Sequence, residues 1–248
     1  MILCALDVET TGFDPKQDRV IELAAKIYNT EEMFFPLAEV STLVFSEQHP
    51  KLTEEIVDIT GINEAMLNSE FSRHPNDVFK ELADKIREHK VQAMLAHNAP
   101  FDKGFVDMEL AIINEILGLP WMCTWKDIQH PAKFKCKKLS HLALDYGIAI
   151  DPKELHRATA DVDLMIDMVK AAGVDFEYLF QRSQVPDVTI RACIPSPFGP
   201  GGDGGVGKDK AASLGFRWQG DRKIWTKTVK EDQLDIEKER LGYNVAII

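Results

Sequence analysis

The sequence predicts an α/β fold in which helices flank a mixed sheet, followed by a small separate module. Strand signals come first along the chain and then alternate with helix signals, which is typical of a mixed sheet covered by helices. A stretch rich in Pro and Gly then ends this region, and neither helices nor strands tolerate such a composition. We therefore expect an N-terminal domain over residues 1–193, a linker over residues 194–207 and a C-terminal module over residues 208–248.

The predicted strands lie mostly in the first part of the chain. Ile2–Val8 is a short apolar run that ends at Thr10-Thr11-Gly12, as expected of a buried strand followed by a turn. Arg19–Tyr28 and Glu39–Phe45 have the composition of the next two strands, which would complete an N-terminal meander. Val91–Ala96 is a further apolar strand.

Helical periodicity separates and follows these strands. The expected helices are Leu52–Asp58, Asn76–Glu88, Phe101–Leu117, Leu139–Tyr146 and Thr159–Ala172. In the second of them Val78, Leu82, Lys85 and Ile86 share one face, which indicates packing of that face against the sheet.

The composition limits the classes of function. The 248 residues carry 29 Lys and Arg against 40 Asp and Glu, a formal charge of −11, and the hydrophobic share of 45% excludes general disorder. No apolar run approaches the roughly 20 residues that span a bilayer, so no membrane partner is expected. The four cysteines form no CxxC pair, which favours reduced thiols and a cytoplasmic location. The acidic balance argues at first against nucleic acid as a partner.

Several carboxylates stand where the core should continue. Asp7 and Glu9 close the first apolar strand, and their spacing of two residues points them to the same face. Asp102 falls in the first turn of the helix that Asn98 would cap, and Asp161 lies beside an apolar helical stripe. Each has an ordinary explanation by itself, such as a solvated strand end or complementation of a helix dipole. Together they would repel one another and resist desolvation unless a cation compensates their charge.

Four carboxylates from three segments make an oxygen-rich site for hard divalent cations. Mg²⁺ or Mn²⁺ suits such ligands, whereas zinc prefers thiolates and histidines. Two such ions about 4 Å apart can activate a water and stabilise the leaving oxygen of a phosphodiester. His156 precedes Asp161 by five residues and is expected on a loop over the site. A lone histidine is more often structural, but in this company an imidazole suits the role of general base.

Three segments carry a resemblance to a known family. Asp7–Gly12, His97–Asp102 and His156–Asp161 resemble, in order and spacing, the three exonuclease motifs of the DEDDh group of DnaQ-like 3′–5′ exonucleases. This group includes the proofreading epsilon subunit of DNA polymerase III, exonuclease X and RNase T. The segment from Leu52 to Ile62 also resembles the part of the family that precedes the second motif, and the resemblance extends to about residue 175. It implies an RNase H-like fold, a five-stranded mixed sheet with helices on both sides.

The resemblance also implies roles for single residues. Asp7, Glu9, Asp102 and Asp161 would bind the metal ions, and His156 would be the general base that marks the histidine subgroup. The reaction implied is the release of 5′-mononucleotides from a 3′ end.

Substrate contacts follow from the same resemblance. The backbone around Thr10 and Thr11 would hold the terminal nucleotide, with Asn98 and Phe101 nearby, and Ile62 would wedge against the last bases.

The C-terminal module has a different character. Between Lys208 and Lys230 seven basic residues face two acids, a local charge of +5, with aromatic residues interleaved and a hairpin turn expected at Gly220-Asp221. One interpretation is single-strand binding by phosphate contact and base stacking, through Trp218, Trp225, Lys208 and Arg217. The other is a miniature domain with a tryptophan core and a solvated basic face. The two are compatible, and this uneven placement of charge removes the objection to nucleic acid.

Three functional hypotheses follow for the chain. The first is a 3′–5′ exonuclease, with two Mg²⁺ or Mn²⁺ ions, acting on nucleic acid with a free 3′ end, DNA being favoured over RNA. The second is a proofreading subunit that docks to a DNA polymerase through its C-terminal segment. The third is a nucleic-acid-binding protein with a vestigial site, against which the complete set of acids and His156 argues. An RNA-directed exoribonuclease of the same group is the alternative to the first.

Overall fold

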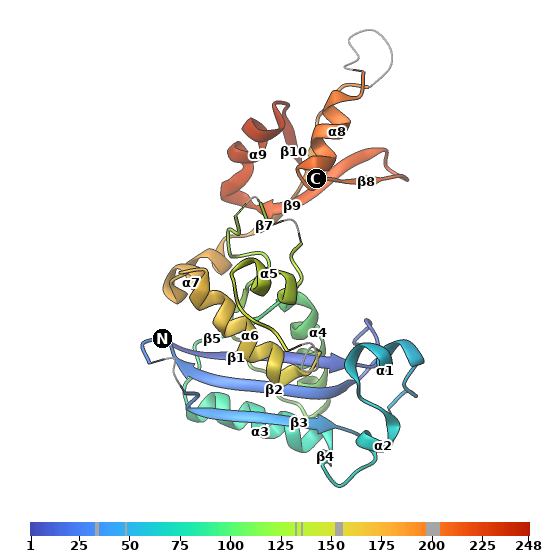
Figure 1. The fold of residues 1–248 in the computed structure, drawn as a ribbon, viewed down its shortest axis with the longest axis vertical. Coiled ribbons are helices and arrows are strands. Elements are labelled where there is room, and N and C mark those ends of the chain that lie inside the picture. Colours follow the sequence, from blue (N-terminus) through green and yellow to red (C-terminus); the bar gives the residue numbers. More distant parts are fainter. Residues whose placement is uncertain (33–34, 48, 132, 135, 152–155, 197–203) are drawn as a thin grey trace. The chain divides into compact units, whose positions relative to one another are not determined.

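The chain folds into two compact units, residues 1–183 and 184–248. A computed structural model describes residues 1–248 except 33–34, 48, 132, 135, 152–155 and 197–203 (Figure 1). The second unit begins at Gln184, before the Pro/Gly-rich stretch, whereas the sequence pattern predicts that the first domain ends at residue 193. The reason is β7 (Asp187–Ala192), which pairs with two strands of the second unit. Half of the expected linker, residues 197–203, lies outside the described residues.

A six-stranded mixed sheet in the order β4-β3-β2-β1-β5-β6 forms the centre of the first unit. Its strands are β1 (Ile2–Thr10), β2 (Val20–Asn29), β3 (Ala38–Val44), β4 (Ser72–Arg73), β5 (Ala93–Ala96) and β6 (Trp121–Cys123). The first three form the predicted antiparallel meander, and the others join in parallel. The predicted α/β class is confirmed, with six strands where five were expected. The sequence pattern missed β4 and β6 because runs of two and three residues are too short to show alternation.

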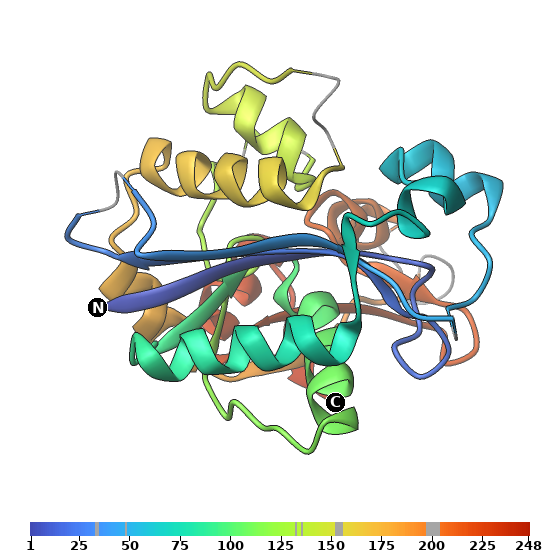
Figure 2. The same cartoon turned by 90° about the horizontal axis from the view of Figure 1, so that it is seen from below.

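Helices cover both faces of this sheet. They are α1 (Glu54–Thr60), α2 (Glu64–Leu67), α3 (Pro75–Glu88), α4 (Ala99–Ile112), α5 (Leu139–Asp145), α6 (Ala158–Ala171) and α7 (Phe176–Gln184). Figure 2 shows α3 and α4 on one face and α5 and α6 on the other. Apolar residues at helical spacing drive this packing, because they bury one stripe of each helix against the sheet.

Successive side chains of β1 point to opposite faces of the sheet, so they pack alternately against the helices of one face and of the other. Cys4 and Leu6 belong to the core beneath α3 and α4, whereas Leu3 and Ala5 belong to the core beneath α5 and α6. Asp7 and Glu9 share the parity of Leu3 and Ala5, so both face the layer of α6.

The second unit has its own sheet and core. The sheet order is β10-β7-β9-β8, with β8 (Arg217–Gln219), β9 (Ile224–Lys230) and β10 (Val245–Ile247). Two helices, α8 (Val206–Ser213) and α9 (Leu234–Leu241), and a short 3₁₀ turn accompany it. Ile190, Phe216 and Leu241 are among its buried core residues. In neither unit, over the residues described, is a helix long and apolar enough to cross a membrane.

Candidate active site

Two carboxylates, those of Asp7 and Glu9, lie near the end of β1. A third, that of Glu22, lies on the neighbouring strand β2. Asp7 lies opposite Ala24 and Glu9 lies opposite Glu22 in the antiparallel register of β1 and β2. The register shifts between Glu9 and Thr10, at a β-bulge that ends the regular ladder. Glu22 is only 3% exposed, although a central strand position normally holds an apolar residue.

Asp102 reaches this strand end from α4. It lies in the first turn of the helix, directly after β5, and is 4% exposed. The backbone N–H of Val8, between Asp7 and Glu9, acts to lower the pKa of this carboxyl, against the larger effect of burial. The parallel pairing of β5 with β1 positions it there, because the carboxyl ends of parallel neighbours meet at the same edge of the sheet.

The third segment brings a histidine as well as a carboxylate. Asp161 lies in the first turn of α6, and His156 precedes this helix in a left-handed backbone conformation with φ 62°. Ligand atoms of Glu9, His156 and Asp161 all lie within 4.8 Å of one another. Glu9 thus lies beside two residues that follow it by 147 and 152 positions in the sequence.

The electrostatics of this cluster favour neutral or cation-bound carboxyl groups. Burial raises the pKa of Asp7 well above its ordinary value, and the neighbouring charges of Asp102, Glu9, Asp161 and Glu22 raise it further. Burial, with the same kind of repulsion, raises the pKa of Glu9 to about 8. Burial likewise raises the pKa of Asp102 to about 8 and that of Asp161 to about 6. A group of acids that suppress one another's ionisation is poised to accept a cation.

Glu22 was not singled out in the sequence, and it ties the third segment to the sheet. Its carboxylate accepts hydrogen bonds from Arg157 Nε at 3.1 Å and Nη2 at 2.6 Å, and from the backbone N–H of Ala158 at 3.0 Å. Arg157 is the N-cap residue of α6 and makes no side-chain cap, so Glu22 satisfies the helix start instead. An acid inside the apolar run of β2 was the signal available in the sequence, the same signal that marked Asp7.

The two threonines after β1 use their hydroxyls to build the turn. Thr10 donates to the carbonyl of Gly12 at 2.6 Å. Thr11 contacts Asp18 at 3.2 Å and accepts from the backbone N–H of Arg19 at 3.0 Å. Both threonines are buried, so any contact with a nucleotide would come from the backbone, as the resemblance implies.

An exposed ring accompanies the predicted Phe101. Phe101 packs on Phe105, with 5.0 Å between ring centroids, and meets the edge of Phe13 at 6.3 Å. Phe13 follows the first motif and is 81% exposed, and no sequence pattern marked it as a site residue. Asn98 occupies the N-cap position of α4 in a left-handed conformation, but its side chain makes no cap hydrogen bond.

Ile62 differs from expectation. Its side chain is fully buried in a cluster with Ile21 and Leu67, so it does not face a substrate as the predicted wedge would. Apolar packing between the α1–α2 connection and β2 accounts for this position.

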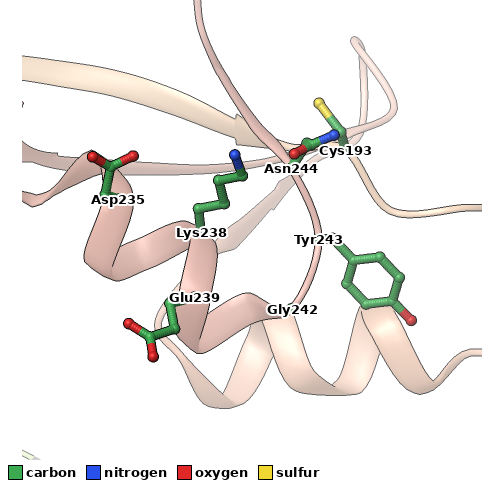
Figure 3. A pocket seen from close by; sticks show the side chains of 7 residues that line it. All are labelled: Cys193, Asp235, Lys238, Glu239, Gly242, Tyr243 and Asn244. Carbon is green, nitrogen blue, oxygen red and sulfur yellow. The ribbon is translucent and has the colours of Figure 1, made fainter.

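The residues of the module that were predicted to bind the substrate all lie in the second unit. Trp218 and Arg217 on β8 are exposed, Trp225 on β9 is half-buried, and Lys208 on α8 is exposed. A pocket in this unit is lined by Cys193, Asp235, Lys238, Glu239, Gly242, Tyr243 and Asn244 (Figure 3). It contains none of the acids clustered at the end of β1, so it is separate from the candidate active site.

A family comparison agrees with this geometry. The RNase_T family, described as exonuclease, matches residues 4–169, which is more than half of the chain and includes all three motifs. The chain belongs to this exonuclease family. The resemblance to an exonuclease family, stated above from the three motifs, is thereby confirmed.

Relatives of the exonuclease include parts of much longer proteins. The PolC-type DNA polymerase III of Staphylococcus epidermidis is 34% identical over 199 residues, which cover 77% of this chain and 13% of the polymerase. That of Thermotoga maritima is 30% identical over 179 residues, covering 68% and 12%. The chain therefore spans a small part of the length of these relatives.

Solved structures share the fold of the exonuclease. Escherichia coli exonuclease I in complex with a dT13 oligonucleotide superposes with a TM-score of 0.67 at 15% identity, over 98% of this chain and 68% of that one. The nuclease domain of 3′hExo, a DEDDh family member bound to rAMP, gives 0.55 at 16% identity, over 68% and 89%. One form of exonuclease I was solved with a bound zinc ion.

The donor set of the candidate site fits divalent metal ions. Carboxylate oxygens dominate in the cluster, with one histidine and no thiolate among its described members, which suits hard cations. Burial and, after it, mutual repulsion raise the pKa values of Asp7 and Glu9, and a bound divalent cation would relieve the repulsion. Arg157 follows His156 directly in the sequence, but its guanidinium is engaged by Glu22.

Proposed function

We propose that the exonuclease removes nucleotides one at a time from the 3′ end of DNA and releases 5′-mononucleotides. One observation carries the proposal: three segments of the chain bring four mutually repelling carboxyl groups to one strand end, beside the imidazole of His156. Such an arrangement has no purpose in a stable core, since it costs stability unless a ligand compensates it.

In this proposal the acids hold two Mg²⁺ or Mn²⁺ ions. Asp7, Glu9, Asp102 and Asp161 would be the ligands, because the charges of the other three add to burial in raising the pKa of Asp7, and ligand oxygens of Glu9 and Asp161 lie within 4.8 Å of each other. Bound divalent ions would supply Lewis acidity for attack of water on the phosphodiester and would neutralise the charge that develops.

His156 would act as the general base. Its side chain is exposed, and a ring nitrogen lies within 4.8 Å of carboxylate oxygens of Glu9 and Asp161. A proton taken from the attacking water at this nitrogen can be released to solvent because of that exposure. The backbone of the turn after β1, shaped by Thr10 and Thr11, would hold the terminal nucleotide.

The test is degradation of DNA single strands labelled at the 3′ or the 5′ end. We expect loss of the 3′ label first, a requirement for Mg²⁺ or Mn²⁺, and no activity in chelator. Asp7→Ala and His156→Ala should each lower kcat by orders of magnitude while DNA binding is largely kept. Persistence of activity in chelator would refute the metal mechanism.

Matched controls lie on the same two helices. Asp107→Ala on α4 and Asp163→Ala on α6 remove exposed acids outside the cluster, and both should keep kcat near that of the unaltered chain. If Asp161→Ala behaves like Asp163→Ala, the assignment of Asp161 as a metal ligand is wrong.

A proofreading role is the second candidate, favoured by the relatedness to PolC-type polymerases. In that case the exonuclease would associate with a DNA polymerase through its C-terminal segment. Co-purification of the full chain with a polymerase after nuclease treatment, abolished by deletion of residues 208–248, would support it. A cytoplasmic location belongs to the same proposal and agrees with the four free cysteines.

RNA is the alternative substrate. Matched DNA and RNA oligonucleotides, single and double stranded, separate the possibilities in one assay. A higher kcat/KM on RNA would replace DNA in the proposal and leave the metal site unchanged.

A further inference from the structure

The second unit carries an aromatic pair that its own core leaves partly uncovered. Trp218 on β8 pairs with Trp225 on β9, and their ring centroids lie 5.6 Å apart at an interplanar angle of 52°. Trp225 packs partly against the core, whereas Trp218 is 50% exposed. A large exposed ring that is held by a second ring is already ordered for contact with a planar ligand.

The two tryptophans lie on one face of the hairpin. Near the base of the hairpin, residues on this same face are part of the core of the unit. Phe216 and Trp218 are two residues apart, and Trp225 and Val229 are four apart, so strand alternation puts all of them on one face. Phe216 is 3% exposed and Val229 is 7% exposed. The core face therefore continues along the hairpin, beyond the core, as an uncovered aromatic surface.

Positive charge surrounds the outer end of the hairpin. Residues 220–223 form the turn, in which the backbone N–H of Lys223 donates to the carbonyl of Gly220 at 3.3 Å. Arg222 and Lys223 in the turn and Arg217 on β8 are exposed, and none of their side chains has a hydrogen bond or ion pair with another described residue. Asp221 is the single acid of the turn. The β8–β9 hairpin can be followed in Figure 1.

Other cations of the unit are occupied by its own fold. Lys227 donates to Glu237, which is 3% exposed, at 2.7 Å and lies over the ring of Phe216 at 5.7 Å. Lys230 is buried and donates to the carbonyl of Val185 at 3.0 Å. Lys227 and Lys230 therefore stabilise the unit itself, whereas the cations of the hairpin turn remain available to a ligand.

We propose that the β8–β9 hairpin binds single-stranded nucleic acid. Trp218 would stack on a base, supported by Trp225, while Arg222 and Lys223 contact neighbouring phosphates. Stacking on an exposed ring and contact of phosphates with unpaired cations are the two terms of sequence-independent single-strand binding. The inference rests on the proposed function, since the bound strand would be the substrate of the first unit. Free cations beside the rings favour phosphate over an apolar protein partner.

The test uses the full chain in metal-free buffer, where the strand stays intact. Binding of a fluorescein-labelled dT oligonucleotide is followed by anisotropy over a series of NaCl concentrations. Trp218→Ala should weaken binding about tenfold or more, and Trp218→Phe should restore most of it. Arg222→Ala/Lys223→Ala should lower the slope of log K against log salt by about 1.4, which is about 0.7 for each phosphate that no longer meets a cation.

The control removes two cations from elsewhere in the same unit. Lys238→Ala/Arg240→Ala on α9 should leave the affinity and the salt slope close to those of the unaltered chain. Thermal unfolding of every variant shows whether weaker binding comes from the altered surface or from a damaged fold. Trp218→Phe provides a folded comparison if Trp218→Ala unfolds the hairpin.

The outcomes separate this inference from the proposed function. Unchanged affinity and salt slope in the folded hairpin variants would overturn it, and so would capture of a protein partner that Trp218→Ala abolishes while DNA binding is kept. Hydrolysis of a trinucleotide should be the same in the hairpin variants as in the unaltered chain. A chain that binds the oligonucleotide through the hairpin but hydrolyses neither substrate would refute the proposed function alone.

Discussion

The ion pair between Glu22 and Arg157 should control catalysis although neither side chain is proposed to bind metal or substrate. Arg157→Ala removes two guanidinium hydrogen bonds, at 3.1 and 2.6 Å, that fix the start of α6 to β2. His156 is the residue before Arg157, and Asp161 lies one turn after it. We expect the substitution to loosen the general base and one metal ligand together.

The exposures of the two partners set the magnitude. The side chain of Glu22 is 4% exposed and that of Arg157 is 43% exposed, so removing Arg157 leaves a buried carboxylate without its cation. Breaking a buried pair in this way costs about 3–5 kcal/mol, and the low end applies because the N–H of Ala158 still donates to Glu22. About 3 kcal/mol corresponds to a fall in Tm of roughly 6–12 °C for a unit of this size. A displacement of about 1 Å at His156 would lower kcat about 100-fold.

The assay combines thermal unfolding in chelator with steady-state hydrolysis of a 3′-labelled single strand. Glu22→Gln is the milder variant, because its amide oxygen can still accept from Ala158 while Arg157 returns to water. It should cost about 1–2 kcal/mol and lower kcat with KM nearly unchanged.

Asp163→Ala is the matched control for this ion pair. Asp163 also links α6 to β2, through Lys26 at 2.7 Å, and its side chain is 53% exposed against 9% for Lys26. It should therefore lower Tm and leave kcat unchanged. Two results would refute the reasoning: normal kcat in a destabilised Arg157→Ala, or an equal fall of kcat in Asp163→Ala.

Three further predictions concern the cluster and the exposed ring beside it. Burial raises the pKa of Glu9 and Asp102 to about 8. The folded state therefore keeps protons that the unfolded state has lost, so the Tm of the metal-free protein should fall as the pH rises from about 5 to about 8. Saturating Mn²⁺ should flatten this decline, and a Tm in chelator that rises with pH would contradict the sign. Asp102→Asn removes one repelling charge, so Tm in chelator at pH 8 should rise by a few degrees while kcat falls about 100-fold or more, and a lower Tm would count against the repulsion. Phe13→Ala should raise KM for single strands about fivefold or more because stacking is removed, with Tm unchanged because the ring is 81% exposed; an unchanged KM would exclude contact with the strand.

The sequence predicted the part of the site that lies at the ends of regular elements. Asp7, Glu9, Asp102 and Asp161 stood out because an apolar strand or stripe defines where a carboxylate is out of place. The antiparallel meander and the helices of the first unit followed from the same periodicities. The convergence of the four acids at the end of β1 stays a prediction; it is supported by the 4.8 Å grouping of Glu9 and Asp161 with His156, and by the burial and neighbouring charges that raise the pKa of Asp7.

The parts that the sequence did not predict depend on contacts between distant segments. Glu22 acquires its meaning from Arg157, 135 residues later, and no local pattern indicates that pair. Ile62 resembled a surface wedge, but burial against Ile21 and Leu67 is a property of the assembled cluster. Similarly, β7 appears as a strand of the second unit only when its partners β9 and β10 are in place.

The number of charged residues in a stretch of sequence is therefore not the charge that a ligand can contact. The local charge of +5 near the C-terminus includes Lys227 and Lys230, which the fold of the second unit uses internally, so the hairpin retains fewer cations than the count suggests. The acidic excess of the whole chain misleads in the opposite direction, because burial raises the pKa values of the clustered acids at the end of β1 and so lowers the negative charge that they carry. Whether a charged side chain serves binding or stability is decided by its partner in the fold. On that criterion the free Arg222 and Lys223 and the mutually repelling Asp7 and Glu9 are the charges available to ligands, which we propose to be a phosphate strand and metal ions.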